Sequence, residues 1–74
     1  MSKMSKLETL ASIEGYEDSM DMLLARGVDS VVPAICINPG CNYTTGMEPD
    51  QDQGFCEHCE TNTVQSCLVL AGMI

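Results

Sequence analysis

The sequence has few of the large side chains with which a small protein builds its core. Among its 74 residues there are no tryptophans, two tyrosines and one phenylalanine. Aromatic rings bury the most surface per residue, and a core in a chain of this length rarely supplies more than about 3–5 kcal/mol. We therefore expect one small domain that needs a further source of stability. The length excludes a multi-domain enzyme and a nucleotide-binding fold with a full parallel sheet.

Long apolar runs are also missing. A membrane-spanning helix needs about 20 mostly apolar residues, and the longest runs here contain only a handful. Lys3 and Lys6 lie near the N-terminus, but no apolar stretch follows them. We therefore expect neither a membrane span nor a signal peptide, and a cytoplasmic protein.

Positive charge is scarce and confined to one end of the chain. Eleven acidic residues outnumber three basic ones, Lys3, Lys6 and Arg26, which gives a net charge of −8. Six acids and no bases follow residue 26: Asp29, Glu48, Asp50, Asp52, Glu57 and Glu60. Because nucleic-acid affinity comes largely from cations that neutralise phosphates, we expect no binding to nucleic acid or to an anionic membrane. A protein with a basic surface is the partner that this charge favours.

The first quarter of the chain has the pattern of a helix. Ser5 and Glu8 are spaced as a capping box, which predicts that the helix begins near Ser5. Gly15 suits the left-handed position that closes a helix. The apolar residues of one face are Leu7, Leu10 and Ala11.

A second short helix is predicted directly after the first. Asp18 or Ser19 can cap its start, and Gly27 is expected to end it. Its apolar stripe is predicted to be Met20, Leu23 and Leu24. Residues 5–27 then form a helical hairpin within an N-terminal segment, residues 1–27.

The next part of the chain favours short strands and turns. Residues 31–37 are mostly β-branched and apolar, which predicts a strand, and Pro33 favours a sheet edge or a bulge because proline has no N–H. Shorter strands are expected at residues 42–45 and from residue 55, with an acidic loop over residues 47–54 between them.

The C-terminal segment fits two interpretations. Only Gln65 and Ser66 are polar within it, so a buried strand is possible. Asn62 or Thr63 can instead cap a helix, and the residues of one helical face would be Val64, Cys67, Leu68 and Ala71. We predict the helix, with Cys67 as a small core residue.

Four of the five cysteines form two close pairs. Four residues separate Cys36 from Cys41, two separate Cys56 from Cys59, and fourteen lie between the pairs. In a cytosolic chain a cysteine cluster indicates metal binding before disulfides, and an odd number of cysteines fits a disulfide framework poorly. Four thiolates facing one point make a closed tetrahedral site that suits zinc. We predict a structural zinc ion held by these four cysteines.

Other uses of the same cysteines stay open. Cys56 and Cys59 can form a redox dithiol, in which His58 would lower a thiol pKa, but this leaves Cys36 and Cys41 without a role. Iron can occupy the same four thiolates. His58 itself is expected to face solvent, with a role as a metal ligand as the alternative.

The residue sets of common enzymes are missing. There is one histidine, no Ser/His/Asp set and no glycine-rich phosphate loop. A zinc ion with four sulfur ligands has no open position for a reacting water. Residues 50–54 lack the third acid and the final glutamate of a calcium loop, so we expect a solvated turn. These features favour a non-enzymatic adaptor or regulator that binds another protein.

The spacing Cys36-x4-Cys41 with Cys56-x2-Cys59 resembles that of the zinc ribbon group. Residues 28–74 are similar to small uncharacterised zinc-ribbon-like proteins of bacteria and their phages. The stretches that carry this likeness are Asp29-Ser30-Val31-Val32-Pro33, Glu48-Pro49-Asp50-Gln51 and Leu68-Val69-Leu70-Ala71-Gly72. The resemblance implies an interaction module, and the basic hairpins of nucleic-acid-binding ribbons are absent from this sequence.

Taken together, the sequence predicts one compact, small α+β domain stapled by a metal. Residues 1–27 supply the N-terminal helical hairpin. Residues 28–74 supply a zinc-ribbon β-hairpin and a C-terminal helix.

Overall fold

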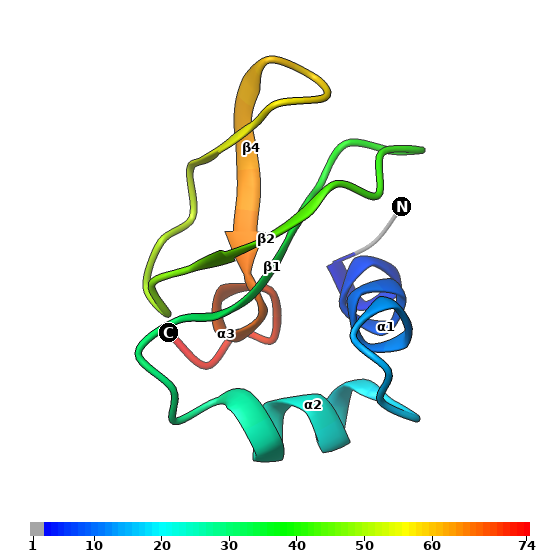
Figure 1. The fold of residues 1–74 in the computed structure, drawn as a ribbon, viewed down its shortest axis with the longest axis vertical. Helices are drawn as coiled ribbons and strands as arrows, with labels where there is room; N and C mark the ends of the chain where they lie inside the picture. Colours follow the sequence, from blue (N-terminus) through cyan, green and yellow to red (C-terminus); the bar gives the residue numbers. More distant parts are fainter. Residues whose placement is uncertain (1–2) are drawn as a thin grey trace.

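The computed structural model describes residues 3–74, in which helices pack beside a small sheet (Figure 1). Two helices precede the sheet and a short third one follows it. The elements are α1 (Lys3–Ile13), α2 (Ser19–Arg26), β1 (Val32–Cys36), β2 (Thr44–Met47), β3 (Gly54–Cys56), β4 (Thr61–Ser66) and α3 (Cys67–Leu70). None of the helices described over residues 3–74 is long and apolar enough to cross a lipid bilayer.

Helix α1 begins earlier than the sequence predicts. It is already helical at Lys3, so Ser5 lies inside the helix and the predicted capping box is wrong. The Glu8 carboxylate instead accepts a hydrogen bond from the backbone N–H of Ser19 at 3.0 Å, which ties α1 to the start of α2. Gly15, with φ of 88°, lies in the left-handed region after the helix, as expected. The predicted apolar face is buried: Leu7, Leu10 and Ala11.

Helix α2 has the predicted cap but a different buried face. The Asp18 carboxylate accepts a hydrogen bond from the N–H of Asp21 at 2.9 Å, which fixes the first turn. Met22 is fully buried, whereas Met20 and Leu24 are 61% and 74% exposed, so the predicted stripe is wrong at these two positions. Its third member, Leu23, is half-buried and packs against the core. Apolar residues cover more than one side of this short helix, and the position of its neighbours decides which side is buried.

The four strands form one antiparallel sheet in the order β2-β1-β4-β3. Strand β1 lies inside this sheet, paired with β2 on one side and β4 on the other, so the predicted edge position is wrong. Pairing with β4 begins only at Ala34. Pro33 precedes that stretch and has a paired neighbour in β2 alone, which is a position where proline is tolerated.

The C-terminal segment is a strand followed by a single helical turn. Residues 61–66 form β4, so the predicted helix is wrong there and the alternative interpretation as a strand is correct. Pairing with β1 outweighs the local helical pattern because it satisfies a row of backbone groups and buries Val64. The Ser66 hydroxyl then caps α3 by accepting a hydrogen bond from the N–H of Val69 at 3.2 Å.

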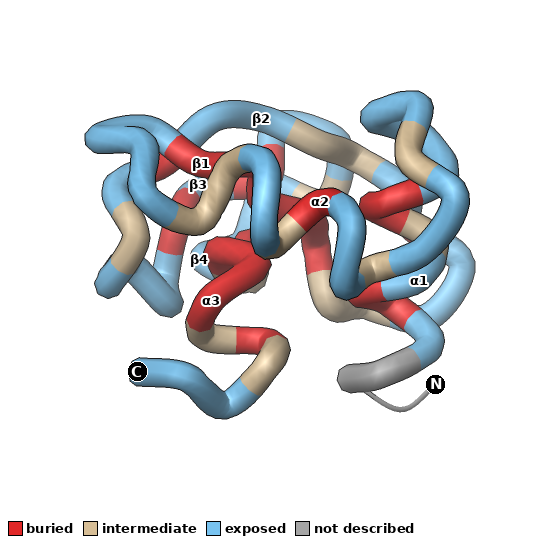
Figure 2. The backbone as a smooth tube through the Cα atoms, turned by 90° about the horizontal axis from the view of Figure 1, so that it is seen from below, coloured by how far each residue is buried: buried red, intermediate tan, exposed pale blue. Residues whose placement is uncertain are grey.

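The buried residues form two clusters. The larger one joins all three helices to β1, and Cys67 lies inside it as expected. Figure 2 shows buried segments of α1, α2 and α3 toward the middle of the molecule. The smaller cluster surrounds the remaining cysteines together with Ala34, Met47 and Val64. Cysteines therefore make up three of the six buried residues of this cluster.

Candidate metal centre

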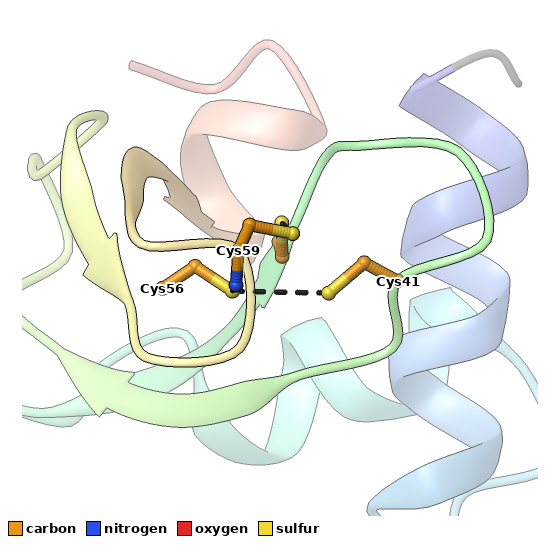
Figure 3. Close-up of side chains that lie close together, drawn as sticks. Cys41, Cys56 and Cys59 are labelled. Carbon is orange, nitrogen blue, oxygen red and sulfur yellow. Dashed lines mark hydrogen bonds between the residues drawn. The ribbon is translucent and has the colours of Figure 1, made fainter.

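The structure brings together the four cysteines that their spacing singles out. Cys36 ends β1, Cys41 lies in the loop between β1 and β2, Cys56 ends β3, and Cys59 lies in the turn before β4. All four sulfurs lie within 4.8 Å of one another. Figure 3 shows Cys41 and Cys56 approaching each other from two separate loops, with Cys59 beside them. This arrangement can hold one metal ion.

The first loop turns back through the predicted Asn-Pro-Gly segment. Gly40 has φ of 80°, in the region that favours glycine. The N–H of Cys41 donates to the carbonyl of Asn38 at 3.1 Å, and the N–H of Cys36 donates to the carbonyl of Tyr43 at 2.9 Å. These bonds close the loop and hold two sulfurs on the same side.

The second loop is tighter and contains a left-handed residue other than glycine. Glu60 has φ of 58°, a conformation that costs about 1–3 kcal/mol and is found where the surroundings impose it. Its N–H donates to the Cys56 carbonyl at 2.7 Å, and the N–H of Cys59 donates to the Cys56 sulfur at 3.3 Å. The turn therefore points both sulfurs inward and supplies a donor to one of them.

Two of the sulfur–sulfur distances match those of a tetrahedral zinc site. Cys41 Sγ lies 3.7 Å from Cys56 Sγ, and Cys36 Sγ lies 3.9 Å from Cys59 Sγ. Zn–S bonds of about 2.3 Å in a regular tetrahedron give sulfur–sulfur edges of about 3.8 Å. The five cysteines are free thiols. A set of four sulfur donors is typical of zinc or iron and disfavours calcium or magnesium.

The thiols of the cluster differ in acidity. Burial raises the pKa of Cys36, but the Thr63 hydroxyl, 3.2 Å from the sulfur, and the Asn38 backbone lower it to about 7. A backbone hydrogen bond at Tyr43 lowers the pKa of Cys41, yet burial and the neighbouring thiols raise it to about 12. Thiolates this close together repel one another, so the four thiols do not all lose their protons unless a cation binds among them. A metal ion would supply that cation.

His58 lies at the surface, as expected, but touches the cluster. Its Nδ1 is 3.6 Å from Cys41 Sγ. The four sulfurs already make a complete ligand set, and the group that can hold an ion does not include His58. Its imidazole is placed to donate a hydrogen bond to a ligand sulfur rather than to replace one.

Lys6 is the residue of the site that sequence reasoning missed. It comes from α1, is 1% exposed, and its Nζ donates to the carbonyl oxygen of Cys41. The ion pairs described over residues 3–74 join Arg26 to Glu14 and Asp29, and none of them involves Lys6. A buried cation is costly without a nearby negative charge. The sequence did contain a signal for this burial: Lys6 lies one helical turn before Leu10, on the face of the helix that is predicted to be apolar.

The acids of the strand region lie at the surface of the molecule. All five are exposed: Glu48, Asp50, Asp52, Glu57 and Glu60.

No protein-family model, curated protein or solved structure matches the chain. The zinc ribbon resemblance therefore depends on the sequence pattern alone.

Proposed function

We propose that the protein holds one structural zinc ion through Cys36, Cys41, Cys56 and Cys59 and acts as a non-enzymatic adaptor or regulator that binds another protein. The convergence of four sulfurs within 4.8 Å carries this proposal. Bound zinc would join the two loops by bonds that the thin core cannot replace. Site formation in small metal domains contributes folding free energy outright.

A structural role is favoured over metal catalysis. Four protein ligands fill a tetrahedral zinc ion, so no position is left for a reacting water. Three of the four cysteines are buried and the fourth is half-buried, which limits access to the metal.

The buried cation next to the cluster supports a charged metal centre. A divalent ion with four thiolates has more negative than positive charge, whereas four neutral thiols have none. The Lys6 ammonium, held at the Cys41 carbonyl, is attracted by such a centre. Ferric iron in the same ligands would also be negative, and its visible absorption distinguishes it from colourless zinc.

A protein partner is favoured by the charge of the chain. The net charge is −8, and the acids of the strand region are exposed. Opposite charge on a partner would speed association and select against acidic surfaces. Affinity purification of the zinc-loaded protein from its native cell tests this part, and we expect a partner with a basic surface whose retention falls with added salt.

The redox alternative uses Cys56 and Cys59 alone. Zinc is preferred because it accounts for all four clustered cysteines. A dithiol mechanism leaves the convergence of Cys36 and Cys41 on the same point without a reason.

A further inference from the structure

An apolar pocket opens between α2 and the C-terminal residues. Its volume is about 310 Å³, and apart from Ser19 its lining is apolar: Leu7, Met20, Leu23, Leu24, Ala71 and Met73. In Figure 1, α2 lies at the opposite end of the molecule from the loops that contain the cysteines. The pocket therefore belongs to a surface separate from the metal centre.

Three of the residues that line this pocket are both apolar and exposed. Met20 is 61% exposed, Leu24 is 74% exposed and Met73 is 64% exposed. Large exposed apolar side chains that gather around a hollow mark interaction sites, whereas single ones are normal. Methionine side chains are flexible and adapt to varied apolar partners.

Acidic residues lie near the start of α2, which contributes Ser19 and Met20 to the pocket. Glu8 accepts a hydrogen bond from the backbone of Ser19, a lining residue, and Asp21 follows Met20 directly on α2. Glu17 and Asp18 are exposed just before the helix. These acids have no basic side chain as a neighbour in sequence, and both basic residues whose side chains are described are already engaged: Lys6 with Cys41, and Arg26 with Glu14 and Asp29.

This charge decides among the possible occupants. A second copy would bring the same acids, and an anionic lipid surface would also be repelled. We propose that the groove between α2 and the C-terminal residues 71–73 binds a short partner segment that inserts aliphatic or aromatic side chains and places lysines or arginines beside the acids. This inference depends on the proposed protein-binding function and assigns its contact surface.

An amphipathic helix is the simplest segment of this kind, because it presents apolar side chains at i, i+3, i+4 and i+7 on one face. The probes are three synthetic 16-residue peptides. The first has leucine at those positions and lysine at the others, the second replaces lysine with glutamate, and the third replaces leucine with serine. Binding to the zinc-loaded protein is followed by NMR of methionine and leucine methyl groups.

We expect the leucine–lysine peptide to shift the methyl signals of Met20, Leu24 and Met73. Leu24→Asn should weaken its binding by about tenfold or more, since an apolar contact is lost. The matched control is Phe55→Ser, because Phe55 is 55% exposed on β3, and it should bind as the wild type does. Circular dichroism checks that both variants fold.

The assignment is overturned if Leu24→Asn binds the leucine–lysine peptide as tightly as the wild type does. It is also overturned if the serine–lysine peptide binds equally well, because binding would then depend on charge alone. A dimer in light scattering that Leu24→Asn dissociates would assign the groove to a second copy instead.

Binding of the native partner to the wild type and to the two variants distinguishes a failure of this inference from a failure of the proposed function. Suppose that an identified partner binds through a basic and apolar segment. If Leu24→Asn abolishes this binding and Phe55→Ser does not, the result supports both the proposed function and the groove assignment. Full retention by Leu24→Asn overturns the groove assignment and leaves the protein-binding function standing. If neither the wild type nor either variant retains a specific partner, the proposed function fails and the inference fails with it.

Discussion

The buried ammonium group of Lys6 donates a hydrogen bond to the carbonyl oxygen of Cys41. This contact joins the first helix to the loop that contributes a sulfur to the cysteine cluster. The residues are 35 positions apart, so the contact forms only when the helix packs on the sheet. Helix packing and metal binding are therefore expected to depend on each other.

Replacing Lys6 with methionine tests this dependence. Lys6→Met keeps much of the side-chain volume but removes the positive charge and the hydrogen bond. We expect zinc affinity to fall by about tenfold, which corresponds to about 1.4 kcal/mol, as measured by competition with a chelator. Arg26→Gln is the matched control, because it removes one positive charge from an exposed ion pair. Equal effects of the two changes would show that net charge alone matters.

Removal of the metal should unfold the whole chain in one step. The larger core cluster joins α1 and α2 to β1 and α3, and isolated helices of this length are marginal in water. During titration with a chelator, far-UV circular dichroism and NMR signals of the helices and strands should be lost together. Dispersed amide signals that persist only from residues 5–27 would show two independent folding units.

Zinc affinity should fall as the pH falls. The pKa of Cys41 is raised to about 12, so its thiol is protonated at neutral pH until a metal displaces the proton. Each proton released on binding makes the affinity change about tenfold per pH unit, with tighter binding at higher pH. Chelator competition between about pH 6 and pH 8 measures the slope. An affinity independent of pH would contradict coordination by four thiolates.

Thiol chemistry separates the zinc protein from the dithiol alternative. Burial raises the pKa of Cys67, which is fully buried, so iodoacetamide should leave it unmodified until the protein unfolds. The four ligands should stay reduced in air while zinc is bound. Insulin reduction above a boiled control, abolished by Cys59→Ser, would favour the redox function instead.

The parts of the fold that are predictable from the sequence depend on near neighbours in the chain. The Asp18 cap and the turn at Gly40 each involve a few adjacent residues, and the two cysteine pairs have short internal spacings. The errors arise where distant residues decide. Strand β4 forms because β1 pairs with it, and the buried face of α2 depends on what covers it. The burial of Lys6 depends on a carbonyl 35 residues away.

The most direct test of the central claim is native mass spectrometry of the protein purified with its metal. The account predicts one zinc ion per chain, which is lost together with folded structure when Cys56 and Cys59 are both replaced by serine. A wild-type chain that is folded but free of metal would contradict it.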